Sequence, residues 1–307
     1  MPPHSKSMPS PHIGRIPKGP SEIAFLEAMQ TVFGLLSFVP IADGTIHRFH
    51  VPGDRTGSHN GWYLLFAEGI AAGCFGSWRT GMVHHWNIRE PVDHHEAESA
   101  RQRIEKAKSQ RETEQRQHQH EAAKYAQRLW RIAHLADPNH GHLIAKRVPA
   151  FHLRQRGNLL LVPLIHDGVL VNLQHIGPDS QKRFLSGGRI TGCYSLLGSI
   201  YPGKPLYICE GWATGATIYQ STGATVACAM TCGNLLAVGQ HLQSRYPDAV
   251  LIMAGDDDRQ TDGNPGKTSA TKAAATLGCG LVLPPWPIDA PLTLSDFNDL
   301  ANWRAAQ

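Results

Sequence analysis

Two apolar runs in the C-terminal third of the chain end in acidic residues. The run LYIC is followed directly by Glu210, and the run AVLIMAG is followed by Asp256, Asp257 and Asp258. Alternate side chains of an extended segment point to opposite sides, so Asp256 and Asp258 face one way and Asp257 the other. This spacing predicts that Asp256 and Asp258 are a pair of metal ligands. Glu210 would either complete the metal site or act as a general base.

Adjacent carboxylates repel one another unless a cation lies between them. At an effective dielectric constant of about 20, each like-charge pair about 4 Å apart costs roughly 4 kcal/mol. Mg²⁺ or Mn²⁺ relieves this cost, because hard cations prefer carboxylate oxygens, and one of these ions is the cofactor expected. No zinc is expected, because none of the six cysteines forms a CxxC pair and none of the 18 histidines falls into HExxH or a paired Cys/His arrangement. An acidic turn after a strand is the alternative interpretation of the Asp triplet taken alone.

Strand and helix patterns alternate along the same region and would position the acidic residues. Strands are expected at 206–209, 224–230, 249–255 and 280–285, with helices at 213–222, 234–247 and 267–278. This alternation predicts an α/β fold, with a mainly parallel sheet flanked by helices. Active sites of such sheets lie at the carboxyl ends of the strands. Glu210 and the Asp triplet are therefore expected to be neighbours.

These segments resemble the Toprim domain, which bacterial primases, topoisomerases and some nucleases share. The resemblance covers about residues 205–285 and rests on LYICEGWATGATI, TCGNL, and LIMAGDDD followed by GKTSATKAA. SDFNDL, near the C-terminus, also resembles the tail of these domains. The resemblance implies that Glu210 is the catalytic glutamate and that Asp256 and Asp258 bind the metal.

A basic segment precedes this region. Lys182, Arg183, Phe184 and Leu185, with Arg189 after them, follow a predicted hairpin whose turn is Asp167–Gly168. The segment resembles the stretch before the Toprim domain of bacterial primases. Basic side chains facing a carboxylate site would hold template phosphates or a nucleoside triphosphate. A solvated basic loop is the alternative.

Lys267 is a further candidate phosphate contact, because it lies where the helix 267–278 is expected to begin. The surrounding TDGNPGKTS is not a complete phosphate loop, since Thr261 stands where that motif needs glycine.

Five regions are expected along the chain. They are a disordered tail (1–20), a small α+β module (21–92), a charged helical linker (93–131), a basic primase-like α+β subdomain (132–204) and the Toprim domain (205–307). The linker would be either a solvated helix or a helix lying along nucleic acid. In the N-terminal module, Arg48, Trp62, Trp78 and Arg79 are candidate template contacts. Filling a small core is an equally good interpretation of the tryptophans.

The resemblance implies a DNA primase of the plasmid- or phage-borne type. Such an enzyme makes short primers on single-stranded DNA from nucleoside triphosphates by metal-dependent nucleotidyl transfer, and here a helicase would be a separate partner. A Toprim nuclease and a nucleic-acid-binding accessory protein are the rival functions. The net charge of +4 among 307 residues is compatible with nucleic-acid binding but does not decide it. No membrane-length apolar run occurs, so a soluble protein of the bacterial cytoplasm is expected.

Overall fold

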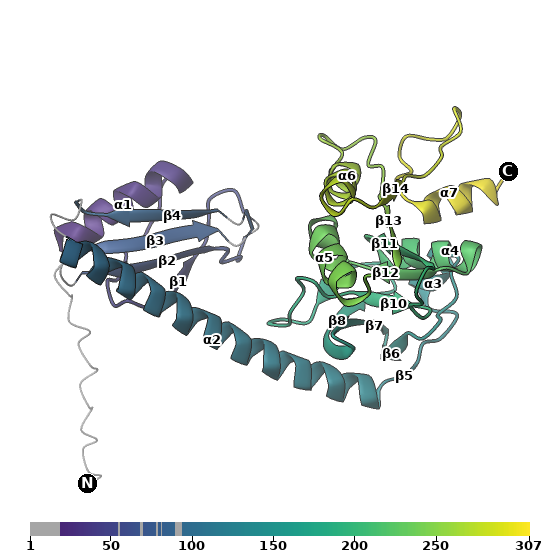
Figure 1. Ribbon diagram of the computed structural model, residues 1–307, viewed down its shortest axis with the longest axis horizontal. Coiled ribbons are helices and arrows are strands. Elements are labelled where there is room, and N and C mark those ends of the chain that lie inside the picture. The colour runs from purple at the N-terminus through teal and green to yellow at the C-terminus, as the bar shows by residue number, and fades with distance from the viewer. Residues whose placement is uncertain (1–18, 55, 68–69, 78, 81, 90–93) are drawn as a thin grey trace, which may run out of the picture. The chain divides into compact units, whose positions relative to one another are not determined.

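The computed structural model describes residues 19–307, except residues 55, 68–69, 78, 81 and 90–93. The chain divides into two compact units, residues 1–114 and 115–307. Figure 1 shows the helices and strands of both units. The expected tail, residues 1–20, lies almost entirely outside the described residues.

The N-terminal unit packs one helix against an antiparallel sheet. Helix α1 (Pro20–Phe33) precedes the strands β1 (His47–Phe49), β2 (Gly61–Phe66), β3 (Ala72–Ser77) and β4 (Val83–Asn87), which pair in chain order. Phe25 and Met29, one helical turn apart, are fully buried against Tyr63 and Phe75. The predicted α+β character of this region agrees with these elements.

Helix α2 (His94–Ile132) coincides with the run of charged residues. The boundary between the two compact units falls inside this helix, so its last turns belong to the second unit. There Ala126 and Leu129 are buried against Leu161 and Leu173. The C-terminal end of α2 therefore packs against the rest of the second unit.

The first sheet of the second unit is antiparallel. It consists of β5 (His134–Leu135), β6 (Arg154–Arg156), β7 (Leu159–His166), β8 (Val169–Ile176) and β9 (Lys182–Phe184), and α3 (Gly141–Lys146) lies between β5 and β6 in the chain. Asp167 and Gly168 form the β7–β8 turn with φ of 52° and 79°. These left-handed conformations suit Asp and Gly, and the predicted hairpin is confirmed.

The second sheet carries the acidic residues. Its strands are β10 (Ser195–Leu197), β11 (Pro205–Cys209), β12 (Thr225–Cys228), β13 (Val250–Ala254) and β14 (Gly280–Val282). Their order is β10-β12-β11-β13-β14, and all neighbours are parallel except β10 with β12. The predicted α/β fold with a mainly parallel sheet is confirmed.

Helices cover both faces of this sheet. The helices are α4 (Trp212–Thr222), α5 (Leu235–Arg245), α6 (Pro265–Leu277) and α7 (Phe297–Arg304), with a 3₁₀ turn (Cys232–Asn234) before α5. Leu206 and Ile208 of β11 lie in the core under α5 and α6, whereas Tyr207 and Cys209 lie in the core with α4. Alternate residues thus serve opposite faces, as a strand requires. In Figure 1, α4 and α7 lie on the opposite side of the sheet from α5 and α6.

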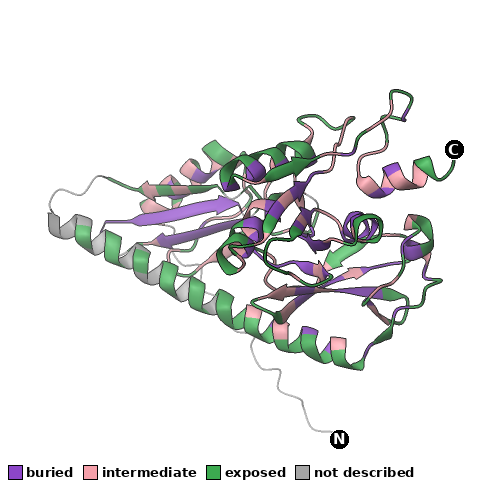
Figure 2. Ribbon diagram, turned by 45° about the vertical axis from the view of Figure 1, so that its right-hand side comes forward, coloured by how far each residue is buried: buried purple, intermediate pink, exposed green. Residues whose placement is uncertain are grey.

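The two sheets of the second unit share one core. Leu160 and Val162 of β7 belong to the same buried cluster as Trp212 of α4 and Val226 of β12. The basic subdomain is therefore packed directly onto the sheet that carries the acids. Figure 2 shows buried strands in both units and an α2 that is largely exposed along its described residues. Among the described residues, no helix combines the length and apolarity needed to cross a membrane.

Candidate active site

The carboxyl ends of β11 and β13 define the candidate active site. These strands are parallel neighbours, with Cys209 paired to Ala254. The residues that follow, Glu210 on one side and Gly255 and Asp256 on the other, therefore leave the sheet at the same edge. The structure thus places the acids of both predicted strand ends side by side.

The three consecutive aspartates point to different surroundings. Asp257 Oδ1 accepts a hydrogen bond of 2.8 Å from Asn264 Nδ2 and lies 4.0 Å from Lys267 Nζ. Asp258 Oδ2 accepts a hydrogen bond of 2.9 Å from the backbone N–H of Gly266, in the first turn of α6. Asp256 Oδ1 is buried and has no hydrogen-bond partner. The Asp257 side chain is therefore bound to the loop before α6, whereas Asp256 Oδ1 is left as an acceptor without a partner.

Burial and the charges of neighbouring acids raise the pKa values of the Asp256 and Glu210 carboxyl groups. Burial raises the pKa of Asp256 to about 8, and the charges of Asp296, Glu210 and Asp258 add to this effect. The pKa of Glu210 is raised by burial and then by the charge of Asp258. Several acids with raised pKa values at one strand edge are a mark of a functional site.

Asp296 is a fourth acid of this site that the sequence analysis did not single out. It is the N-cap of α7, and its side chain accepts a hydrogen bond of 2.8 Å from the N–H of Asp299. Burial raises the pKa of Asp296, and the charge of Asp299 raises it further. In the sequence, an Asp before a helix is most simply a cap. Only its position within SDFNDL, the segment resembling a Toprim tail, pointed to the site.

One of the predicted basic residues reaches the acids. Lys182 is on β9, and its positive charge lowers the pKa values of both Glu210 and Asp256 against the opposing effects of burial. Its Nζ lies 4.0 Å from where a Cβ on Gly211 would be. Lys182 therefore faces the acids from the antiparallel sheet.

The other basic residues of that segment point elsewhere. Arg183, the next residue along β9, is exposed and donates a hydrogen bond of 3.3 Å to Gln181. Arg189 donates a hydrogen bond of 3.1 Å to the carbonyl of Thr191, and its charge acts on His241. Lys267 lies beside Asp257, in the first turn of α6. The recorded contacts of these three cations are thus with Gln181, Thr191 and Asp257 rather than with Glu210 or Asp256.

The predicted template contacts of the N-terminal unit differ in accessibility. Trp62 is only 3% exposed and packs with Leu64 and Cys74, so it fills the core and cannot stack on a base without opening that core. Arg48 is exposed on β1, and Arg79 is exposed and forms an ion pair with Asp54. Trp78 lies outside the described residues.

The donor set suits a divalent cation. All four acids supply oxygen ligands, and the unpartnered Oδ1 of Asp256 is a buried acceptor that a cation would satisfy. Their oxygens do not form a group of three within 4.8 Å of one another; among the described residues only His166, Asp167 and His241 do so. Mg²⁺ keeps several of its waters, so an ion at this edge would contact some of these acids directly and the others through water.

Comparison with known proteins identifies the domain that carries the acids. The family model for the Toprim domain matches residues 205–306, and Toprim domains bind divalent metal ions. Two proteins named DNA primase TraC from Escherichia coli are 33% identical over 271 residues and 30% identical over 259 residues. Each match covers 80% of this chain but only 24% and 18% of the relatives. The chain thus spans about a quarter or less of the length of these relatives.

Two solved structures also show similarity. One contains primase domains of two gp4 subunits of a bacteriophage bound to an RNA/DNA hybrid and dTTP, with a TM-score of 0.35, 14% identity, and coverage of 50% of this chain and 76% of that chain. The other is the DnaG catalytic core, with a TM-score of 0.34, 15% identity, and coverage of 55% and 56%.

The raised pKa of Asp256 predicts that the metal-free protein becomes less stable to unfolding as the pH rises. The folded-state pKa of about 8 lies above the ordinary value of 3.8, so folding favours the protonated acid. That stabilisation is complete at low pH and is lost as the pH rises through about 8. In metal-free buffer at pH 8 to 9, we therefore expect Asp256→Asn to unfold at a higher temperature than the wild type.

Thermal unfolding followed by circular dichroism, with and without Mg²⁺, measures this effect. Asp257→Asn is the matched control, because its side chain already has a partner in Asn264, and it should not gain stability. A lower unfolding temperature for Asp256→Asn than for the wild type at high pH would contradict the claim that Asp256 is a buried carboxylate without a partner.

Proposed function

We propose that this chain, whose residues 205–306 carry a Toprim domain, is a DNA primase that joins nucleotides on a single-stranded DNA template by metal-dependent nucleotidyl transfer. The similarity to DNA primases is the observation that carries this proposal, because it covers 80% of the chain and so includes the segment upstream of the Toprim domain. The geometry supports it, since that upstream segment contributes Lys182 to the edge where the acids lie.

Glu210, Asp256 and Asp258 would hold the metal ion. The backbone N–H of Gly266 fixes Asp258 Oδ2, while Asp256 Oδ1 is free to coordinate. Bound there, Mg²⁺ or Mn²⁺ would neutralise triphosphate charge and lower the pKa of the attacking 3′-hydroxyl. Glu210, with its raised pKa, is suited either to accept that proton or to hold the ion.

Asp296 would act beside these three acids. Its charge contributes to the raised pKa values of both Asp256 and Glu210. Because its carboxylate also caps α7, it can fix the position of that helix relative to the strand ends. We therefore propose that Asp296 lies beside the metal ligands and positions α7 rather than binding the ion as one of the three main ligands.

Lys182 would bind phosphate oxygens. It is exposed and faces the acids, so a nucleoside triphosphate bridging metal and lysine would be neutralised from both sides. Arg183 and Arg189 lie on the same segment, and their hydrogen bonds go to Gln181 and Thr191. They suit contacts with the template backbone, which need no proximity to the metal. Lys267, at the beginning of α6, is a further phosphate contact of this kind.

Loss of any of the three acids should abolish synthesis while leaving the fold intact. We expect Glu210→Gln, Asp256→Asn and Asp258→Asn each to lower nucleotide incorporation by about 10²-fold or more, because charge stabilisation supplies most of the catalysis. The measurement is incorporation of labelled nucleotides on single-stranded DNA with Mg²⁺ or Mn²⁺. Asp289→Asn, an exposed acid of the same domain, is the control and should remain active.

The same assay separates the rival functions. Metal-dependent degradation of the template without products would assign a Toprim nuclease. DNA binding without synthesis or cleavage in the wild type would favour an accessory protein. Either outcome would contradict the primase proposal.

Lys182→Gln tests the phosphate contact separately. Removing one charged contact to a phosphate costs about 1.5–3 kcal/mol, which corresponds to a rise in the nucleotide KM of about tenfold or more. Steady-state kinetics against nucleotide concentration measure this change. Lys204→Gln, another exposed lysine of the second unit, should leave the KM unchanged. An unaltered KM in Lys182→Gln would remove this lysine from the site.

A further inference from the structure

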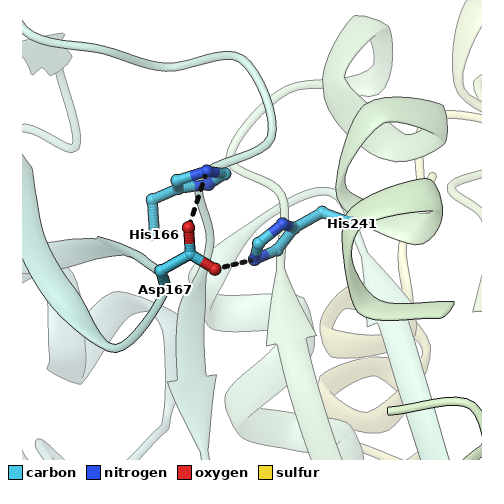
Figure 3. Close-up of side chains that lie close together, drawn as sticks. All are labelled: His166, Asp167 and His241. Atoms are coloured by element: carbon cyan, nitrogen blue, oxygen red, sulfur yellow. Dashed lines mark ion pairs between the residues drawn. The ribbon is translucent and has the colours of Figure 1, made fainter. Parts of the chain in front are cut away.

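A second cluster of metal-binding side chains lies outside the carboxylate site. His166 is the last residue of β7, Asp167 begins the β7–β8 turn, and His241 is on α5. One ligand atom from each of these residues lies within 4.8 Å of the other two. Figure 3 shows the two imidazole rings directing a nitrogen toward the carboxylate between them.

The distances in the cluster are close to those of a tetrahedral metal site. His166 Nε2 lies 3.5 Å from Asp167 Oδ2, and His241 Nε2 lies 3.7 Å from Asp167 Oδ1. Zinc binds imidazole nitrogen and carboxylate oxygen at about 2.0–2.2 Å, which places tetrahedral ligands roughly 3.3–3.5 Å apart. The present separations are longer than hydrogen bonds and slightly longer than this tetrahedral edge. The two contacts run to different oxygens of Asp167, so the carboxylate and the stacked rings would have to reorient for one ion to bind all three side chains.

In each ring, the nitrogen that faces Asp167, Nε2, has no hydrogen-bond partner among the described residues. His166 Nδ1 lies 3.0 Å from the carbonyl oxygen of Gly192, so Nδ1 carries the proton and Nε2 keeps its lone pair. His241 Nε2 is buried and has no hydrogen-bond partner. A buried polar atom without a partner is costly and requires an explanation. Metal coordination supplies one, because both free nitrogens face the same carboxylate.

Two cations near the cluster offer another reason for the position of Asp167, in which its carboxylate serves only as an ion-pair partner. Arg245 Nη1 lies 3.1 Å from Asp167 Oδ1, and the charge of Arg189 acts on His241. The Arg245 contact does not account for the rings, which stack with centroids 4.2 Å apart. The Arg245 side chain is 43% exposed and also donates a hydrogen bond to Tyr246, so metal binding would have to displace its contact with Asp167 Oδ1 or leave that oxygen to the arginine.

We propose that His166, Asp167 and His241 bind one Zn²⁺ ion, with water at the fourth position. Two imidazoles and a carboxylate form a ligand set that suits this ion. The ion would fasten the β7–β8 hairpin of the antiparallel sheet to α5 of the Toprim domain. This departs from the expectation of no zinc, which considered cysteine pairs and short histidine motifs, whereas this site joins histidines that lie far apart in the sequence. The inference goes beyond the proposed function, because it requires no primer synthesis.

Zinc binding to the full chain tests the proposal directly. Zn²⁺ is titrated in competition with a chromogenic chelator, with excess Mg²⁺ present to occupy the carboxylate site. We expect one Zn²⁺ per chain, a higher unfolding temperature when it is bound, and an affinity at least tenfold lower in Asp167→Asn. Asn tolerates the positive φ of this turn, so the fold is expected to survive the substitution.

Two further variants sharpen the test. His241→Gln should weaken zinc binding as Asp167→Asn does, whereas His152→Gln, on an exposed histidine, should not. Arg245→Gln should tighten binding several-fold, because it removes a positive charge from Asp167 Oδ1 without removing a ligand. Co²⁺ in place of Zn²⁺ should give the strong visible absorption of tetrahedral coordination. The proposal is overturned by the absence of stoichiometric zinc, or by equal zinc affinity in wild type and Asp167→Asn, which would mean adventitious binding to surface histidines.

Discussion

Repulsion among buried carboxylates is the interaction that most constrains the second unit, residues 115–307. Asp256, Glu210 and Asp296 all have raised pKa values, with burial as the largest cause and neighbouring acids adding to it. A fold does not retain such a cluster for its own stability, because uncharged residues would pack there at lower cost. The arrangement becomes favourable when a divalent cation shares the oxygens. The proposed chemistry uses the same ion to neutralise phosphate charge.

The surrounding elements hold the acids at one edge and leave ligand atoms free. The parallel pairing of β11 and β13 places Glu210 beside Asp256, and the first turn of α6 fixes Asp258 through the N–H of Gly266. The antiparallel sheet contributes Lys182, the cation whose charge opposes the raised pKa values. The shared core between the two sheets keeps this lysine in place. The proposed zinc site would reinforce the same junction at the β7–β8 hairpin.

The sequence allowed prediction of those features that depend on local pattern. Acids directly after apolar runs had to lie at strand ends, and Asp-Gly between two strands had to form a turn. Asp296 was missed because a helix cap explains an Asp at that position equally well. The pairing of His166 with His241 could not be found, because it depends on how α5 packs against the hairpin. Trp62 was offered as a template contact, but an aromatic residue in a short strand fits a buried core equally well, and the core is where it lies.

Binding of Mn²⁺ to the full chain, followed by electron paramagnetic resonance of the free ion, tests the central claim most directly. The claim is that Glu210, Asp256 and Asp258 form one cation site. The account predicts that Mn²⁺ binds the wild type and Asp289→Asn with equal affinity. It predicts that Asp256→Asn and Glu210→Gln bind at least tenfold more weakly. Equal affinity in the wild type and both acid variants would contradict it, because the buried carboxylates would then have no cation to share.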